Sequence, residues 1–317
     1  MKYKTPILPD ETPAKKNLIK KTSRAIYLQF HNREEDEKGE MDPLLEREFS
    51  PAEGVIQRYE NRVLILVSSK CFAYCSFCNR RFFVREEKEG NEKTLKVNIE
   101  NAIDYIRSRK KIREVLLSGG DPLTLKDEEI LQIIEKLREI PSVSLIRIGT
   151  RAPTTNPSRI TIPLVRSLTK FKPIIISVHF NHPDELYKES IDACQKFLNN
   201  GIMVLNQAVL LKGINDTPQI IAELCWKLAE NGIRPYYLFQ CDRVKGTARF
   251  WVPLKKGIEI AKEIRKMLPG HAIPHYVVDL PGKSGKAWID PFNPPRKIRN
   301  GYILHGSSGK TYLYRDI

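Results

Sequence analysis

The sequence predicts an α/β fold whose core is a partial TIM-type (β/α)6 barrel. From residue 62 onward, short apolar runs alternate with longer amphipathic segments, which is typical of repeated β/α units. Nearly every glycine-rich or polar cluster directly follows one of the apolar runs. In a parallel barrel such positions meet at the carboxyl ends of the strands, where active sites form. A chain of 317 residues is long enough for this barrel.

Six apolar runs are the expected barrel strands. In chain order they are RVLILV (62–67), EVLLS (114–118), LIRIGT (145–150), IIISVHF (174–180), VLNQAVLL (204–211) and PYYLFQC (235–241). Helices are expected between them because apolar residues recur at helical spacing. The clearest of these segments are NIENAIDYIRSR (98–109), DEEILQIIEKLREI (127–140), YKESIDACQKFLNNG (187–201) and PQIIAELCWKLAENG (218–232). Two of them end in Asn-Gly, which is a helix-stop signal.

The two ends of the chain are expected to lie outside the barrel core. Residues 1–50 predict an arm or short helical extension, and residues 51–270 form the expected core. Residues 271–317 are expected to hold a catalytic loop and terminal strands at VVDL (277–280), GYILHG (301–306) and KTYLYR (310–315). No strict repeat or low-complexity linker interrupts the chain, which favours a single catalytic domain.

Composition favours a cytoplasmic protein. No run approaches the roughly 18 to 20 apolar residues of a membrane span, and the first residues lack a signal-peptide core. Six cysteines, three of them isolated, do not form the pattern of a secreted disulfide framework. The net charge of +15 is scattered, without an aromatic-interleaved basic motif, so a solvated surface explains it better than nucleic-acid binding.

The most informative motif is CFAYCSFC, which places Cys71, Cys75 and Cys78 within eight residues. A closed zinc site needs a fourth Cys or His at matching spacing, and the nearest histidine after Cys78 is His179. Cubane iron–sulfur clusters normally take four thiolates, so three would leave one iron open to an outside ligand. We therefore predict that these three cysteines hold a [4Fe-4S] cluster at which chemistry begins.

Taken together, the motifs resemble the lysine 2,3-aminomutase family, whose members are pyridoxal phosphate (PLP)-dependent enzymes of the radical S-adenosylmethionine (SAM) superfamily. The resemblance runs from about Asp42 to the C-terminus. Its stretches are DPL (42–44), RYENRVL (58–64), CFAYCSFCNRRF (71–82), LSGGDPL (117–123), RIGTRAP (147–153), HFNHPDE (179–185), NQAVLLKGIND (206–216), RPYYLFQCD (234–242) and VVDLPGKSGK (277–286). It implies a radical SAM barrel and the cofactors [4Fe-4S], SAM and PLP.

The implied reaction is that of an isomerase. It exchanges the α-amino group of L-lysine with a β-hydrogen and gives β-lysine. An electron from the cluster cleaves SAM to a 5′-deoxyadenosyl radical, and SAM is regenerated at the end. The implied partners are the amino-acid substrate and an electron donor such as flavodoxin or ferredoxin, and a homo-oligomer is an open possibility.

The resemblance also assigns residues to the PLP site. Lys286 closes the PGxxGK run and is expected to form the internal Schiff base with PLP, because an amine on a flexible stem can bond the aldehyde and withdraw. Lys283 is the nearby alternative. Arg58 and Arg62 are expected to contact the PLP phosphate, since an arginine fork suits a dianion; otherwise they are exposed charges at a strand edge.

For SAM, the turn Gly119-Gly120-Asp121 is expected to meet the amino group, with Asp121 as an acceptor; the alternative is a simple strand-to-helix turn. His179, together with Asn206 or Gln207, is expected on the same face, although a histidine satisfied within the barrel mouth is equally plausible on sequence grounds.

For the substrate, Arg80 corresponds to the family position that pairs with its carboxylate. Asp242 and Asp279 correspond to the pair that receives the distal ammonium of lysine, whereas a glutamate site should present a cation or neutral amide there. Each aspartate alone could be a cap at a strand end.

Several departures from the family pattern widen the range of functions that the sequence allows. Lys283 and Ser284 replace glycines of typical lysine aminomutases, and Thr217 replaces a zinc-binding cysteine, so we predict no structural zinc. The stretch DRVKGTARF (242–250) resembles the branch that makes (R)-β-lysine for elongation factor P. The sequence is also compatible with a radical SAM enzyme for another amino acid or amine, and with a non-catalytic iron–sulfur protein that binds nucleic acid.

Overall fold

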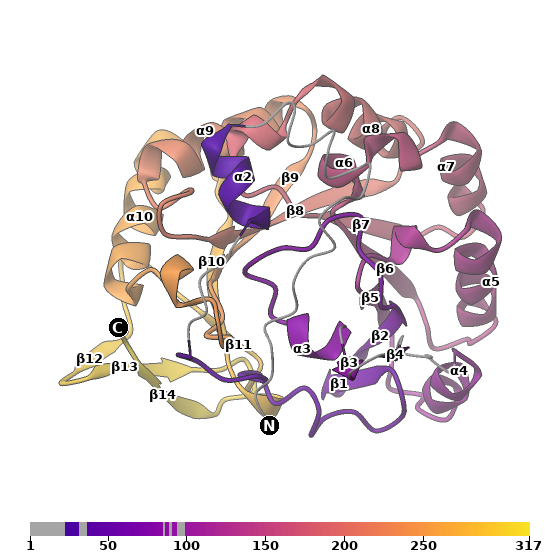
Figure 1. The fold of residues 1–317 in the computed structure, drawn as a ribbon, viewed down its shortest axis with the longest axis horizontal. Coiled ribbons are helices and arrows are strands. Elements are labelled where there is room, and N and C mark those ends of the chain that lie inside the picture. The colour runs from indigo at the N-terminus through magenta and orange to yellow at the C-terminus, as the bar shows by residue number, and fades with distance from the viewer. Residues whose placement is uncertain (1–22, 32–36, 85, 89–90, 94–98) are drawn as a thin grey trace.

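A curved nine-stranded sheet, surrounded by helices, organises the chain (Figure 1). The computed structural model describes residues 23–31, 37–84, 86–88, 91–93 and 99–317. The strand order is β1-β2-β5-β6-β7-β8-β9-β10-β11. Neighbours from β2 to β10 are parallel, while β1 and β11 pair antiparallel at the two ends of the order. This is the partial TIM-type barrel that the sequence predicts.

The strand bounds agree closely with the predicted apolar runs. The six expected strands are β2 (Arg62–Ser68), β5 (Glu114–Gly119), β6 (Leu145–Thr150), β7 (Ile174–Val178), β8 (Met203–Leu210) and β9 (Arg234–Gln240). The remaining strands of this sheet are β1 (Val55–Tyr59), β10 (His275–Asp279) and β11 (Lys286–Trp288). Because β10 pairs in parallel with β9, VVDL extends the barrel sheet as a seventh parallel strand and does not lie beyond it. The sequence-based domain boundaries stay a prediction.

Six helices cover the outer face of the sheet. They are α4 (Ile99–Arg107), α5 (Asp127–Arg138), α7 (Ile162–Thr169), α8 (Lys188–Leu198), α9 (Pro218–Glu230) and α10 (Leu254–Met267). The starts of α7 and α9 have a physical cause, since Thr161 and Thr217 each accept a hydrogen bond from a first-turn backbone amide and a proline follows. Thr217, at the position where the family pattern has a zinc-binding cysteine, is thus a helix cap.

Shorter elements complete the described chain. The short helices are α2 (Arg24–Phe30), α3 (Arg81–Val84) and α6 (Ala152–Thr155), and 3-10 turns are η1 (Pro122–Thr124), η2 (Pro157–Arg159), η3 (Pro183–Glu185), η4 (Ala248–Phe250), η5 (Gly270–Ala272) and η6 (Gly282–Ser284). Strand β3 (Glu86–Lys88) pairs antiparallel with β4 (Asn91–Lys93), and a separate sheet contains β12 (Arg296–Ile298), β13 (Gly301–His305) and β14 (Thr311–Arg315). Helix α2 lies within the expected N-terminal extension; most of that extension lies outside the described residues, so it stays a prediction.

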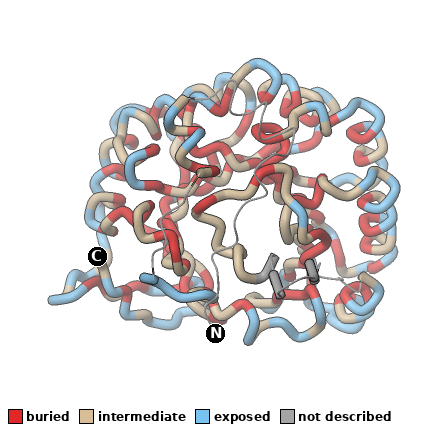
Figure 2. Tube along the Cα trace, viewed as in Figure 1, coloured by how far each residue is buried: buried red, intermediate tan, exposed pale blue. Residues whose placement is uncertain are grey.

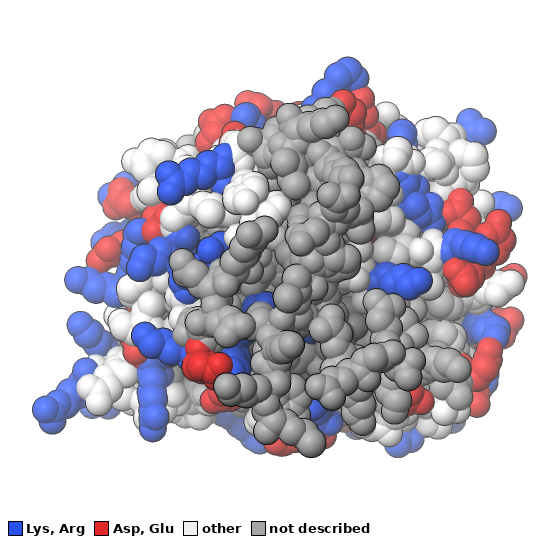
Figure 3. Space-filling model, viewed as in Figure 1, with Lys and Arg blue, Asp and Glu red and all other residues white. Residues whose placement is uncertain are grey.

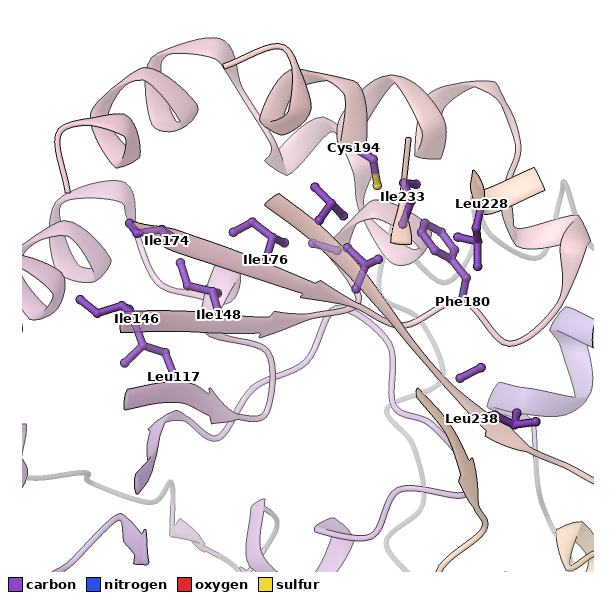
Figure 4. Close-up of a cluster of buried hydrophobic side chains, with 14 of the residues drawn as sticks. Leu117, Ile146, Ile148, Ile174, Ile176, Phe180, Cys194, Leu228, Ile233 and Leu238 are labelled. Atoms are coloured by element: carbon purple, nitrogen blue, oxygen red, sulfur yellow. The ribbon is translucent and has the colours of Figure 1, made fainter. Parts of the chain in front are cut away.

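The hydrophobic core lies between the sheet and its helices. Along β6, Ile146 and Ile148 are fully buried, while Arg147 and Gly149 on the other face are only partly buried. Figure 4 shows Ile174 and Ile176 beside them on β7, with Cys194 and Leu228 from the helical layer. Burial is concentrated along this layer (Figure 2). The packing of the strands therefore fixes where their carboxyl ends lie.

The surface carries charge of both signs. Lys and Arg lie around the rim of the face shown in Figure 3, with Asp and Glu among them. Among the described residues, no helix is long and apolar enough to cross a membrane.

Candidate active site at the barrel mouth

The carboxyl ends of the parallel strands gather many of the predicted site residues at one mouth of the barrel. The cysteine loop follows β2, the Gly119-Gly120-Asp121 turn ends β5, and Asp242 follows β9. Asp279 is the last residue of β10. This is the arrangement expected when each β/α unit contributes one loop to a common site.

The glycine turn is fastened to the start of the cysteine loop. Gly120 N donates to Ser68 O at 2.6 Å, and Asp121 N donates to Lys70 O at 2.7 Å. A Cβ added at Gly119 would lie 2.2 Å from Ser68 O, and one added at Gly120 would lie 2.1 Å from Lys70 O. Only glycine fits at both positions, because any side chain would separate the two loops.

The Asp121 carboxylate is engaged within the protein. It accepts hydrogen bonds from Leu123 N at 3.0 Å, from Thr150 Oγ1 at 2.7 Å and from Arg151 N at 2.8 Å. Burial raises the pKa of this carboxyl, while the donors oppose that effect. The side chain thus orders the turn, and its expected contact with the SAM amino group stays a prediction.

The three motif cysteines lie on one loop between β2 and α3, and none of them forms a disulfide with another described cysteine. Cys75 Sγ accepts a hydrogen bond from Arg151 Nη1 at 2.8 Å, and Cys78 N donates to Cys75 O at 3.2 Å. Burial, and next the proximity of Cys75, raise the pKa of the Cys78 thiol. Three soft donors beside a guanidinium suit a metal cluster that carries negative charge. No three His, Cys, Asp or Glu side chains are grouped as a metal site in the described ranges, so the ligand set stays a prediction.

Arg151 links the cysteine loop to two distant segments. Its Nη2 donates to Glu185 Oε1 at 2.6 Å and to Gln29 Oε1 at 2.5 Å. Burial opposes the positive charge, but the proximity of Cys75 and Glu185 outweighs burial and raises the pKa of Arg151. Neither Gln29 nor Glu185 was selected from the sequence, although Arg151 belongs to the TRAP motif that follows β6.

On the opposite side of the mouth, Lys286 meets Asp279 across the hairpin β10–β11. The two residues are direct cross-strand partners, and Lys286 Nζ lies 2.7 Å from Asp279 Oδ1. Their side chains are 21% and 11% exposed, so the pair is accessible from the mouth. The Nζ atom lies 5.6 Å from the centroid of the Tyr237 ring and 5.0 Å from that of Phe239. A reactive amine beside aromatic rings fits a planar aldehyde cofactor such as PLP.

The two arginines expected at the PLP phosphate lie in different surroundings. Arg58 is mostly buried; its Nε donates to Gly282 O at 2.9 Å, its Nη2 donates to Leu280 O, and its Nη1 lies 3.9 Å from Asp279 Oδ1. It therefore orders the loop before Lys286. Arg62 is exposed at the first residue of β2, with its guanidinium 3.9 Å from the centroid of the Tyr59 ring. A phosphate contact by either residue stays a prediction.

Asp242 lies close enough to Asp279 for the two carboxylates to repel. Burial, and next the charge of Asp279, raise the pKa of Asp242 to about 7, although Asn79 and the cations Arg58 and Lys286 oppose the shift. Asn79 Nδ2 donates to Asp242 Oδ2 at 3.0 Å. The predicted pair of aspartates is thus brought together by the ends of β9 and β10.

Arg80 forms a bidentate ion pair with a residue that sequence reasoning missed. Its Nε and Nη2 donate to the two carboxylate oxygens of Glu46 at 2.8 and 2.6 Å, and Glu46 is 3% exposed. Arg80 Nη1 lies 3.5 Å from Ser118 Oγ. Asp42 orders the Glu46 turn, because its carboxylate accepts from Glu46 N and from Arg47 N, each at 2.9 Å. The DPL motif was the available signal for this turn.

His179 and Asn206 occupy the adjacent part of the mouth. Burial, and next the nearby arginines Arg151, Arg80 and Arg147, lower the pKa of His179 to about 4, so its ring is neutral at neutral pH. Asn206 fastens the end of β7, since its side chain bonds both the N–H and the C=O of Phe180, at 2.8 and 3.1 Å. Gln207 is partly buried at the adjoining irregularity of β8, and its contact with SAM stays a prediction.

Comparison with known proteins agrees with this geometry. The family model of the radical SAM superfamily matches residues 65–225. An L-lysine 2,3-aminomutase of Clostridium subterminale is 44% identical over 87% of this chain and 65% of its own length, and one of Methanococcus maripaludis is 46% identical over 79% and 57%. A glutamate 2,3-aminomutase of Clostridioides difficile is 41% identical over 92% of this chain and 69% of its own length. The chain thus spans less than two thirds of the two lysine enzymes.

Proposed function

The chain belongs to the lysine 2,3-aminomutase family of the radical SAM superfamily, and we propose that it is an isomerase that converts L-lysine to β-lysine. Superfamily membership implies a [4Fe-4S] cluster and SAM. We extend this to PLP as the third cofactor, bound at Lys286. When bound, the cluster and SAM supply an organic radical, and PLP holds the amine that migrates.

The observation that carries the choice of substrate is the pair Asp242 and Asp279. The pair lies where β9 and β10 end, beside the lysine proposed to hold PLP. A lysine side chain ends in an ammonium, which two carboxylates stabilise. The γ-carboxylate of glutamate would instead face two like charges in a partly buried pocket. We therefore favour lysine over glutamate, although one relative is a glutamate enzyme.

The other polar residues have roles that follow from their contacts. Lys286 provides the amine that holds the cofactor. The carboxylate of Asp279 accepts a hydrogen bond from that amine, or from the distal ammonium of the substrate. Arg58 orders the Leu280–Gly282 backbone through two hydrogen bonds. Arg80 is proposed to bind the substrate carboxylate through Nη1 and the remaining hydrogen of Nη2, since Nε and one Nη2 hydrogen already serve Glu46.

The test is anaerobic incubation of the cluster-reconstituted protein with PLP, SAM, a chemical reductant and L-lysine, with β-lysine read by mass spectrometry. We expect β-lysine from L-lysine and little β-glutamate from L-glutamate under the same conditions. Formation of 5′-deoxyadenosine without β-lysine would keep radical SAM chemistry and reject lysine. Absence of both products in protein with an intact cluster would reject the proposed function and favour a binding role.

The radical SAM enzyme for another amine, which the sequence left open, is distinguished in the same experiment. Substrates that lack the distal ammonium would then yield product at rates comparable with lysine. The stereochemistry of any β-lysine distinguishes the (R)-producing branch, because chiral derivatisation separates the two enantiomers.

A further inference from the structure

The guanidinium of Arg151 occupies a buried position between the cysteine loop and the N-terminal helix. We propose that Arg151 and Glu185 form a charge pair that sets the reduction potential of the iron–sulfur cluster, with Arg151 raising the potential and Glu185 lowering it. The inference rests on the cluster implied by superfamily membership, and it does not depend on the identity of the amino-acid substrate.

The two terminal nitrogens of the Arg151 guanidinium have different partners. Nη1 donates to Cys75 Sγ at 2.8 Å, and Nη2 donates to Glu185 Oε1 at 2.6 Å. The guanidinium carbon lies 4.4 Å from the centroid of the Phe30 ring and 5.5 Å from that of Phe77. Aromatic rings therefore restrict the plane of the fork, and the cation cannot turn from sulfur toward solvent without breaking these contacts.

Glu185 is fixed as firmly as its partner. It is fully buried, and its second oxygen, Oε2, accepts from Asn181 N at 2.6 Å and from His182 N at 2.9 Å. The carboxylate is therefore held in place by backbone donors even when Arg151 is replaced. This separation makes it possible to remove either charge while the other stays near Cys75.

Helix α2 encloses the charge pair. Gln29 is 0% exposed, its Oε1 accepts from Arg151 and from Asn181 Nδ2, and its backbone carbonyl accepts from Ser76 N at 2.8 Å. Ile26 and Phe30 pack on Ala73 and Cys75 of the cysteine loop. Gln29 Nε2 and Arg151 Nε are buried without a hydrogen-bond partner among the described residues. Such buried, unused donors near the cysteine loop are compatible with an additional acceptor there, such as the sulfide of a cluster.

Electrostatics gives the sign of each effect. One-electron reduction adds a negative charge to the cluster, and hydrogen bonds and net charge at the sulfurs set the potential. A buried cation stabilises the reduced form, whereas a buried anion destabilises it. Because buried charges are screened less than exposed ones, the charge of Arg151 acts strongly over its contact with Cys75, and Glu185, bonded to the other end of the guanidinium, offsets part of that charge.

The test is an anaerobic redox titration of the reconstituted full chain, monitored by the electron paramagnetic resonance signal of the reduced cluster. We expect Arg151→Met to shift the midpoint potential to more negative values by at least a tenfold change in the reduction equilibrium, which is 59 mV for one electron. Glu185→Gln keeps the shape and, with its single carbonyl oxygen toward Asn181 N and His182 N, the backbone hydrogen bonds; it removes the charge and the hydrogen bond from Arg151, and we expect a shift in the opposite direction. Arg138→Met removes a partly buried arginine whose hydrogen-bond partners are backbone carbonyls just before β6 and β7, and should leave the potential unchanged.

Midpoint potentials that shift in opposite directions in Arg151→Met and Glu185→Gln would show electrostatic control and not a merely structural contact. Shifts of the same sign in both variants, or potentials equal to that of the unchanged protein, would overturn the proposal. If Arg151→Met fails to take up iron, Arg151→Lys and Glu185→Gln decide: we expect the lysine variant to lie closer to the unchanged protein than Glu185→Gln does. Equal potentials in both would overturn the proposal, whatever amino acid the enzyme converts.

Discussion

The two sides of the barrel mouth differ in how completely their charges are paired. Around Cys75, Arg151 is matched by Glu185 and enclosed by Gln29. Around Lys286, the side chains are partly exposed, and Asp242 has an amide, Asn79, as its hydrogen-bond partner. The fold thus pairs the charges of one side within the protein and leaves the other with a carboxylate whose natural partner is a cation. The first side suits a resident cluster, the second an exchanging substrate.

The strongest test of the open side, by which we mean the side of the mouth around Lys286, Asp279 and Asp242, is the removal of its amine. Lys286→Ala should lower turnover by about 10³-fold or more, because the covalent link to PLP would be lost. The absorbance of lysine-bound PLP should disappear as well. Lys283→Ala is the matched control, since Lys283 Nζ lies over the Phe49 ring at 5.6 Å, and it should retain both. Unaltered PLP absorbance in Lys286→Ala would contradict the assignment.

Removal of the charge on Asp279 tests whether the open side selects the substrate. Asp279→Asn should reduce kcat/KM for lysine by about 10²-fold, because a partly buried ammonium would lose a charged partner. Binding of SAM should change much less, as measured by equilibrium binding to the reconstituted protein. Equal losses in lysine turnover and SAM binding would show that Asp279 supports the whole mouth and has no specific role at the substrate.

A smaller effect on catalysis is expected from the ion pair of Arg80 with Glu46, which borders the open side. Glu46→Gln removes the charge that faces Arg80 and should reduce the free energy of unfolding by about 2 kcal/mol, less than for a fully buried pair because Arg80 is 19% exposed. The KM for lysine should rise more than kcat falls, since the guanidinium loses its orientation. Urea unfolding and steady-state kinetics measure these two changes. Glu48→Gln, on the exposed side of the same segment, should leave both unchanged.

The mildest perturbation is a change of pH. Since the pKa of Asp242 is raised to about 7, this carboxyl is largely neutral below pH 7 and charged above it. The KM for lysine should therefore fall as pH rises from 6 to 8, by up to about tenfold per unit at the lower end. Calorimetry should detect proton release on lysine binding at pH 6. A KM independent of pH over this range, or the same profile in Asp242→Asn, would contradict the prediction.

The barrel could be predicted from sequence because its signals are local. Each central strand is a short, largely apolar run, and burial of its helix-facing side keeps that side apolar, as the alternating burial along β6 and β8 shows. The edge strands were missed for physical reasons: β11 has three residues, too few for a pattern, and β1 mixes polar with apolar residues. VVDL resembles an isolated strand, and its pairing with β9 depends on the register of distant segments.

Candidate site residues could be selected from the sequence only where they belong to a recognisable motif. The cysteines, Lys286 and the two aspartates belong to recognisable stretches, and the structure brings Asp242, Asp279 and Lys286 together. The partners of Arg151 and Arg80 were not predicted, because these contacts span 122 residues to Gln29 and 34 residues to Glu46. No periodicity encodes such contacts. The exposed position of Arg62 likewise depends on the strand end at which it lies.

The register of the hairpin β10–β11 restricts insertions and deletions in this part of the chain. Asp279 and Lys286 are opposite each other at its last rung, and Leu280 N donates to Gly285 O at 2.9 Å to close the loop between them. Side chains alternate between faces along a strand, so one residue inserted within β10 or β11 would turn Asp279 or Lys286 away from the other. Insertions and deletions here should therefore be rarer over evolutionary time than substitutions, even at neighbouring positions with no role in chemistry.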